Sequence, residues 1–285
     1  MDAPDYTTRE RIEDLRGERE FAWGGSGLWA SGCLDGLARP TVAVVGTRAA
    51  TPYGRRLAHR FAADLGAAGC CVVSGLALGI DAAAHEGALD AGAPTIGVLG
   101  GGHRKFFPSR NRSLAEQMIA SGGAVLSPFA PDEDARPHQF LARNGVVAAL
   151  ADAVVVIEAP ARSGALNTAG WAAGRIPVLA VPGDVDRRHV AGCHDLIRDG
   201  AILARSAADV LDVLQLCAAP ALPPVERDGT AGALLAVLRG GECDLDALAG
   251  ATALPAAQIL AELAILELEG VVERRGANRF GCSCA

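Results

Sequence analysis

The sequence predicts an α/β protein with an extended Rossmann-like, doubly wound parallel sheet and a small C-terminal winged-helix-like domain. Apolar, β-branched runs alternate with amphipathic helical segments from Thr41 to about residue 213. This alternation is typical of a parallel sheet that is covered on both faces. After a proline-rich segment, three short helical patterns precede a hairpin, which is the order of elements in a winged helix-turn-helix.

Periodicity and glycine stops define the individual elements of the predicted sheet. In the first helix, for example, Leu57, Phe61 and Leu65 recur at four-residue spacing and share one face. The apolar runs are short and each ends in glycine or proline, as buried strands do. We expect strands over 41–46, 70–75, 94–102, 123–129, 151–160 and 176–183, and helices over 53–68, 80–92, 110–122 and 166–174.

The chain divides into four predicted segments. These are an N-terminal helical or irregular extension over 1–40, the Rossmann-like domain over 41–213, a linker over 214–229 and the winged-helix-like domain over 230–285. The extension opens with an amphipathic helix over about 7–19, and three prolines between 220 and 224 mark the linker. The final hairpin has Gly276 and Asn278 as turn residues.

Composition restricts the location and the chemistry. A chain of 285 residues with 50% hydrophobic residues can bury a sizeable core. Its 8 scattered cysteines and charged, signal-free beginning predict a reducing cytoplasm, and no run is apolar enough to predict a membrane span. Cys193-His194 and Cys282-x-Cys284 lack partner pairs at zinc spacing, so we expect neither metal nor cofactor.

The net charge of −7 argues against a protein that coats nucleic acid by bulk electrostatics. Both ends of the chain are acidic, whereas bases balance acids over 41–213. Those bases are arginines apart from Lys105, and arginine suits bidentate phosphate contacts and stacking on bases. Nucleic acid could therefore bind only where these arginines cluster.

Several candidate contacts follow predicted strands, because ligands of doubly wound sheets bind outside the carboxyl ends of the strands. Gly46, Thr47 and Arg48 follow the first strand, and the helix that opens near Tyr53 offers its free N–H groups to a phosphate. The alternative is a tight turn with a surface arginine. The dinucleotide pattern G-x-G-x-x-G is absent at this position.

Two further strand ends carry candidate residues. Ser74 and Gly75 end the second strand and Gly79 follows it, and glycine there lets the backbone approach a ligand closely. Asp81 is placed to cap the next helix, and capping alone would explain it. Glu158 ends a later strand, where an acid either binds ligand or anchors neighbouring backbone, and both interpretations stay open.

The segment 100–112 is the strongest candidate. Basic side chains, which can hold phosphates, occur there together with aromatic rings, on which nucleobases can stack. Its candidate contacts are Lys105, Phe107, Arg110, Asn111 and Arg112. The alternative is that Phe106 and Phe107 belong to the core and the charges to a solvated loop, although only one of two adjacent aromatic side chains usually points inward. Arg143, Asn144, Ser163 and Gly164 are further candidates at later junctions.

Seven blocks resemble, in order and over about 41–213, the signature blocks of the DNA-processing protein A (DprA/Smf) family. They are VAVVGTRAATPYG, VVSGLALGIDAAAHEGAL, TIGVLGGG, FFPSRNRSLAEQM, FLARNGVVAAL, VVVIEAPARSGALNTAGWAAGRIPVLAVPG and GCHDLIRDGA. Residues 228–280 are similar to the winged-helix domain of many members. The resemblance implies a non-enzymatic protein that binds and protects single-stranded DNA during natural transformation and loads RecA recombinase on it, usually as a homodimer.

The resemblance also implies roles for individual residues. Arg48 would grip a phosphate beside Gly46 and Thr47, and Arg143-Asn144 match the family's R-N pair. Ser74, Gly75 and Gly79 would shape the pocket, and Lys105, Arg110 and Arg112 would extend it. The chain departs from the pattern at Gly145, where the family usually has another arginine. The segment before Thr41 is also shorter than the helical domain of many members, and GGGHRKF departs from the usual acidic-apolar loop.

Two other classes of protein remain as alternatives. A similar Rossmann variant occurs in phosphoribohydrolases and other binders of nucleotide-derived ligands, but neutral Asn167 and Thr168 stand where those enzymes carry an acid. A transcription factor is disfavoured because the helix over 255–269 contains Glu262, Glu267 and Glu269 and no base. We expect this domain to contact protein, either a partner or its own core domain.

Overall fold

The computed structural model describes residues 8–10, 28–216, 229–238, 243–252, 254–268, 272–274 and 279–282. The chain divides into two compact units, Met1–Cys217 and Ala218–Ala285. Each unit has a hydrophobic core of its own. Residues 217–228, which include most of the predicted linker over 214–229, lie outside the described residues.

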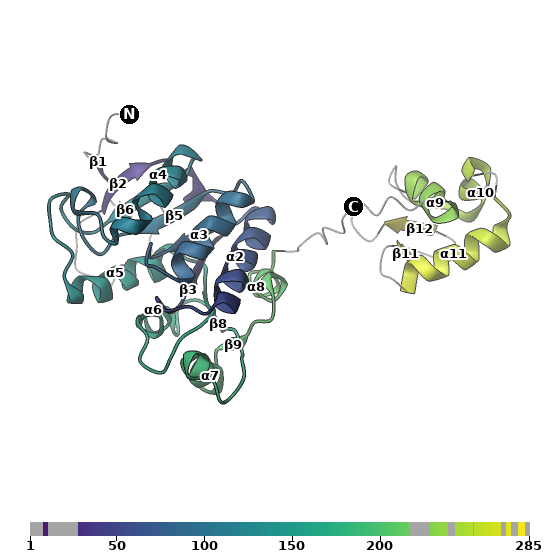
Figure 1. The fold of residues 1–285 in the computed structure, drawn as a ribbon. Coiled ribbons are helices and arrows are strands. Elements are labelled where there is room, and N and C mark those ends of the chain that lie inside the picture. The colour runs from purple at the N-terminus through teal and green to yellow at the C-terminus, as the bar shows by residue number, and fades with distance from the viewer. Residues whose placement is uncertain are drawn as a thin grey trace. The chain divides into compact units, whose positions relative to one another are not determined.

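A nine-stranded sheet forms the centre of the first unit (Figure 1). Its strands are β1 (Thr8–Glu10), β2 (Leu28–Gly32), β3 (Thr41–Val45), β4 (Cys71–Ser74), β5 (Thr95–Val98), β6 (Ala124–Ser127), β7 (Ala153–Val156), β8 (Val178–Ala180) and β9 (Ile202–Leu203). The strand order is β1-β2-β6-β5-β4-β3-β7-β8-β9. Neighbours from β6 to β9 are parallel, whereas β1-β2 and β2-β6 are antiparallel. The predicted doubly wound, mostly parallel sheet is thereby confirmed.

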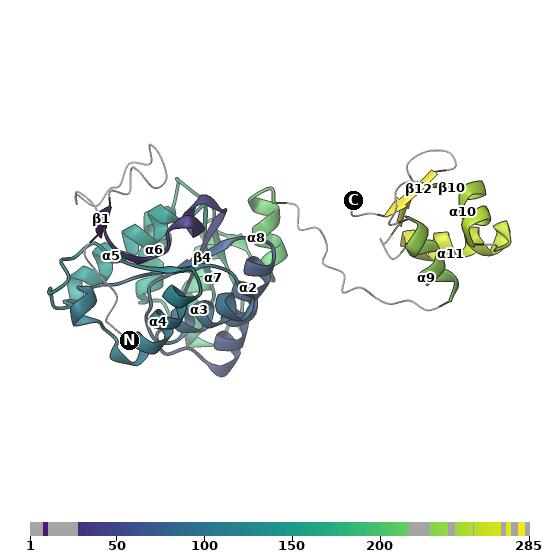
Figure 2. The same ribbon diagram turned by 90° about the horizontal axis from the view of Figure 1, so that it is seen from above.

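Helices cover both faces of this sheet (Figures 1 and 2). They are α2 (Pro52–Ala67), α3 (Ile80–Asp90), α4 (Arg112–Ala120), α5 (Pro137–Leu150), α6 (Gly164–Ala172), α7 (Ala191–Arg198) and α8 (Ala207–Val213). Alternate residues of β3 face opposite cores: Val42 and Val44 pack with side chains of α2, α3 and α8, whereas Ala43 and Val45 pack with those of α5, α6 and α7. The strands are apolar throughout because both of their faces are buried.

The N-terminal segment differs from the helical or irregular extension predicted over 1–40. Thr8–Glu10 form β1 where a helix over 7–19 was predicted, and the rest of that range lies outside the described residues. The glycine-rich stretch contains β2, which pairs with β6 and buries Leu28 and Ala30. This strand forms because it pairs with an existing sheet edge. The glycines of the surrounding stretch interrupt the alternation of apolar and polar residues by which a strand is usually predicted.

The second unit confirms the predicted winged-helix domain. It contains α9 (Thr230–Leu238), β10 (Cys243–Asp244), α10 (Leu245–Thr252), α11 (Ala256–Leu268), β11 (Val272–Arg274) and β12 (Arg279–Cys282). The three strands pair in the order β10-β12-β11, so β10 adds a strand that the sequence pattern did not reveal. The predicted turn residues Gly276 and Asn278 lie outside the described residues.

The second unit contains apolar helices, whose length and composition can be compared with those of a membrane-spanning helix. Among the described residues, no single helix combines the length and apolar character that a span requires. The pair Leu245–Thr252 and Ala256–Glu267 meets the requirement only jointly, and the chain bends by 110° between them.

Candidate nucleic-acid interface

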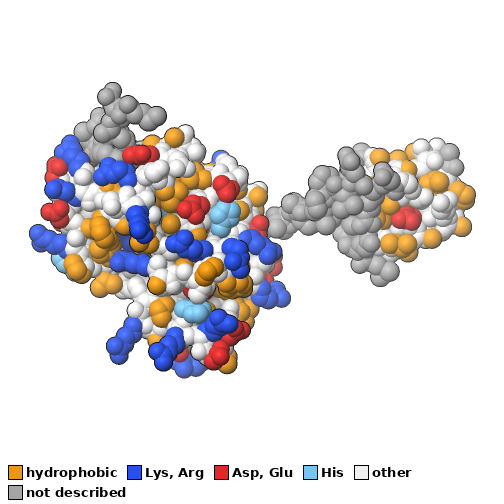
Figure 3. Space-filling view, viewed as in Figure 1, with side chains coloured by type: hydrophobic (Ala, Val, Ile, Leu, Met, Phe, Trp, Pro, Cys, Tyr) orange, Lys and Arg blue, Asp and Glu red, His pale blue; other side chains and the backbone are white. Residues whose placement is uncertain are grey.

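A cavity of about 650 Å³ opens where the strand order reverses, between the carboxyl ends of β3 and β7. The chain leaves β3 for α2 on one face of the sheet and leaves β7 for α6 on the other. Diverging loops of this kind create the crevice in which doubly wound proteins bind ligands. Lys and Arg side chains are spread over the face of the first unit in Figure 3 and border exposed hydrophobic side chains.

The structure brings most of the predicted contacts to this cavity. The predicted residues that line it are Gly46, Thr47, Arg48, Gly75, Phe107, Arg143, Asn144, Ser163 and Gly164. The predicted residues outside its lining are Tyr53, Ser74, Gly79, Lys105, Arg110, Asn111 and Arg112. These residues come from the connections that follow β3, β4, β5 and β7 and from the helices α5 and α6, so the site exists only in the folded chain.

Exposed Arg48 and Phe107 and the partly buried Phe140 form a group that we call the stacking platform. The Arg48 guanidinium carbon lies 4.8 Å from the centroid of the Phe140 ring, and the Phe107 ring meets Phe140 edge-on with centroids 6.0 Å apart. Phe107 is 54% exposed, whereas its neighbour Phe106 is buried with Leu99. An exposed ring beside a cation offers a face for a nucleobase and a charge for its phosphate.

Arg143 lies behind the platform as a buried cation. Its Nη1 donates a hydrogen bond to the Val98 carbonyl oxygen at 3.1 Å. Gly75 makes room for it, because a Cβ atom there would collide with the guanidinium. Burial lowers the pKa of Arg143 to about 10, although the negative charge of Asp81 opposes this shift. Arg143 therefore lines the cavity and places a positive charge just below the protein surface.

Asp81 is not the helix cap that the sequence predicted. Gly79 precedes α3 with φ of 88°, so the helix begins at Ile80 and Asp81 falls in its first turn. The Asp81 carboxylate accepts a 3.4 Å hydrogen bond from Ala77 N. Burial raises the pKa of Asp81, and the positive charge of Arg143 opposes that rise. The proximity of these opposite charges was not visible in the sequence.

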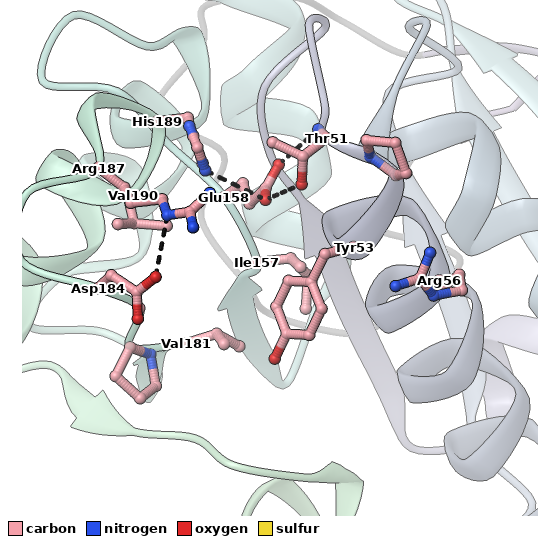
Figure 4. Close-up of a pocket in the computed structure, with 13 residues that line it drawn as sticks. Thr51, Tyr53, Arg56, Ile157, Glu158, Val181, Asp184, Arg187, His189 and Val190 are labelled. Carbon is pink, nitrogen blue, oxygen red and sulfur yellow. Dashed lines mark hydrogen bonds and ion pairs between the residues drawn. The ribbon is translucent and has the colours of Figure 1, made fainter.

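Glu158 anchors the backbone of the loop that carries Arg48 (Figure 4). Its carboxylate accepts hydrogen bonds from Thr51 N at 3.0 Å and from Thr51 Oγ1 at 2.6 Å. Its carbonyl oxygen accepts a third from Thr47 N at 2.7 Å. Thr51 Oγ1 in turn accepts from Gly54 N and caps α2. Of the two interpretations left open for this acid, the contacts support the anchor.

The beginning of α6 forms the opposite rim of the cavity. Ser163 caps this helix, because its hydroxyl accepts from Ala165 N at 3.3 Å. Asn144 Nδ2 donates to the Gly164 carbonyl oxygen at 3.1 Å and to Asn167 Oδ1 at 3.3 Å. These bonds orient the helix so that its positive end meets the cavity, where exposed Arg162 adds a charge. The rim is suited to an anion.

Three of the predicted contacts are buried and support the walls. Ser74 Oγ donates to the Val44 carbonyl oxygen at 2.6 Å. Asn111 Nδ2 donates to the carbonyl oxygens of Leu76 and Ala77. Gly79 packs against the backbone of the Arg48 loop, where a Cβ atom would lie 2.7 Å from the Arg48 oxygen. Sequence position alone did not distinguish these supporting residues from surface contacts.

The remaining predicted bases face away from the lining. Lys105 Nζ lies 3.9 Å from Asp134 Oδ1, and the Arg112 guanidinium carbon lies 5.3 Å from the centroid of the Phe106 ring. Arg110 is exposed beside the start of α4. Tyr53 lines a second cavity. These residues could meet only a ligand that extends beyond the first cavity.

Phe140 and Arg162 line the cavity but were not predicted as site residues. Phe140 lies three positions before Arg143 on α5, a spacing that places both on one helix face and could have revealed it. The departure at Gly145 has a local explanation: a Cβ atom there would lie 3.2 Å from the Trp171 indole on α6. An arginine at 145 would require Trp171 to move.

The fold and cavity define a Rossmann-like ligand-binding protein with an appended winged helix. Residues 21–215 match the family model for DNA recombination-mediator protein A, and residues 218–278 match that of the DprA winged helix domain. The chain belongs to the DNA recombination-mediator protein A (DprA) family.

Individual members of this family are also similar to this chain in sequence and in structure. The chain is 42% identical over 260 residues to the putative DNA processing protein DprA of Mycobacterium tuberculosis, covering 87% of this chain and 66% of the relative's length. The crystal structure of DprA from Streptococcus pneumoniae superposes with a TM-score of 0.62 at 40% identity, over 66% of each chain. DprA from Helicobacter pylori, whose structure concerns its single-stranded DNA binding mode, superposes with a TM-score of 0.65 at 28% identity, over 75% of this chain and 98% of that one.

Replacing Glu158 by alanine is expected to reduce the free energy of unfolding of the first unit by about 1–3 kcal/mol. The Thr51 amide and hydroxyl would lose their acceptor in a partly buried place. Glu158→Gln keeps an acceptor oxygen and should lose less. Urea unfolding followed by tryptophan fluorescence measures this, because Trp29 and Trp171 lie in the first unit. The exposed Glu116→Ala is the control, and equal stability of Glu158→Ala and wild type would contradict the anchor.

Proposed function

We propose that this protein binds and protects single-stranded DNA in the cavity between β3 and β7, as a mediator of recombination during natural transformation. The stacking platform is the observation that carries the proposal, since it combines an exposed cation with two aromatic rings at a helix-rimmed crevice. Base faces are accessible in a single strand and hidden inside a duplex. The single-stranded DNA binding mode described for the Helicobacter pylori protein supports the same ligand class.

The protein would act by binding and by passing the strand to a partner, without catalysing a reaction. The family name, DNA recombination-mediator, supports a transfer of the bound strand to RecA recombinase. A cytoplasmic location follows from this role. The thiol state of Cys33, Cys70, Cys71, Cys193 and Cys243 is compatible with it.

We also propose that two copies associate through β9 as a homodimer. β9 lies at the end of the strand order, so one of its edges has no strand beside it among the described residues. Ile202 and Leu203 on this strand are 42% and 43% exposed. An apolar edge strand is a template for pairing with another chain.

Arg48→Ala is expected to weaken single-strand binding at least about tenfold, because it removes a charge-assisted contact to phosphate. The slope of log affinity against log salt should fall by about 0.7, the value for one phosphate contact on a single strand. Fluorescence anisotropy at two salt concentrations, with single-stranded and duplex oligonucleotides, measures both effects. Arg175→Ala is the matched control, since this exposed arginine precedes β8 at the opposite end of the strands. Preference for duplex, or an unchanged Arg48→Ala, would contradict the proposal.

Removing residues 218–285 is expected to leave single-strand affinity unchanged. The helix α11 carries Glu262 and Glu267 and presents exposed Leu260 and Ile265, a surface suited to protein and repulsive to phosphate. Anisotropy with the chain ending at Cys217, a compact unit, checks this expectation. Loss of binding in the shortened chain would assign the winged helix to the DNA site instead.

Leu203→Asp is expected to convert the dimer to a monomer, because a carboxylate would replace an apolar side chain on the sheet face that the two paired strands share. Sedimentation equilibrium of wild type and variant measures the change. Val185→Asp is the control, as Val185 is 92% exposed in the loop after β8. The interface assignment is wrong if Leu203→Asp and wild type have the same mass.

A further inference from the structure

A second cavity of about 640 Å³ is lined by Glu158 and Thr51 (Figure 4). The first turn of α2 forms one wall, and the loop that follows β8 forms the other. Its floor consists of the buried side chains of Ile157, Val181 and Val190. The cavity therefore has an apolar floor, and its two walls come from different parts of the chain.

Tyr53 is the main aromatic surface of this cavity. Its side chain is 59% exposed although its ring is large and apolar, and Figure 4 shows it projecting into the cavity. Tyr53 and Arg48 were predicted as parts of one site, but the two side chains line different cavities. An exposed ring above an apolar floor is a surface on which a nucleobase can stack.

Cations stand on both walls. Arg56 follows Tyr53 by three residues on α2, so both project from one helix face, and it has no ion pair among the described residues. On the opposite wall Arg187 Nε donates to Asp184 Oδ2 at 2.9 Å. This exposed pair is weak, and a guanidinium has five donors, so Arg187 can also meet a phosphate.

The acids of this cavity are already engaged. Both Glu158 oxygens accept from Thr51, and His189 Nε2 lies 3.9 Å from Glu158 Oε1. Asp184 pairs with Arg187. An incoming phosphate would therefore meet mainly Arg56 and Arg187.

The two cavities are neighbours at the carboxyl ends of the strands. Pro160 lines the first and Glu158 the second, and the loop after β3 contributes Arg48 to the first and Thr51 to the second. We propose that the second cavity binds a further nucleotide of the same single strand, with its base on Tyr53 and its phosphate between the arginines of the two walls. This inference rests on the proposed function.

Binding of oligothymidylates of increasing length tests the assignment. Tyr53→Ala should leave the affinity of the shortest bound oligonucleotides unchanged and weaken longer ones about fivefold or more, the effect of losing one base–aromatic stack. Tyr53→Phe, which keeps the ring, should restore the wild-type affinity, and Arg56→Ala should weaken only the longer oligonucleotides. Arg48→Ala, by contrast, should weaken binding at every length.

Three outcomes would overturn the inference. If wild type binds in an Arg48-dependent manner while Tyr53→Ala matches wild type at every length, the second subsite is wrong and the proposed function stands. If Tyr53 is needed for free thymidine 5′-monophosphate but for no oligonucleotide, the cavity takes a free nucleotide and not the strand. If wild type binds no single strand, the proposed function fails together with this extension.

Discussion

The adjacency of β3 and β7 at the centre of the sheet is the constraint on which the candidate site depends. The register pairs Val45 with Val156, so both strands end at the same level. The chain then turns to opposite faces of the sheet, and the diverging loops leave a crevice that no side chain of the strands can fill. Glu158 stabilises this geometry, because its carbonyl and carboxylate groups hold Thr47 and Thr51 of the facing loop.

The crevice offers different contacts to different parts of a nucleotide. The helix terminus at Ser163 and the guanidinium of Arg48 suit a phosphate, whereas Phe107 and Phe140 suit a base. Arg143 lies underneath, where its charge acts without direct exposure. Because the whole chain has a net charge of −7, affinity for DNA has to come from this local arrangement and not from the overall field.

Local sequence was sufficient for the parallel core and for part of the site. Long apolar runs and glycine stops predicted the strands, because burial on both faces of a sheet leaves a continuous pattern. β2 and the two-residue β9 were not predicted, since pairing with a neighbouring strand determines them and local preference does not. The sequence also did not show how deeply a side chain is buried. Ser74 and Asn111 were predicted to contact the DNA, but their polar atoms bond buried backbone. Phe140 was not predicted, although its three-residue spacing from Arg143 places both on one face of α5.

Photochemical crosslinking tests the location of the single strand most directly. An oligonucleotide that carries 5-iododeoxyuridine forms a covalent bond, on irradiation, to an aromatic side chain stacked on the modified base. Mass spectrometry of the digested complex then identifies the residue. The account predicts crosslinked peptides that contain Phe107 or Phe140. Crosslinks confined to residues 218–285, or to the end of the sheet at which Arg175 lies, would contradict it.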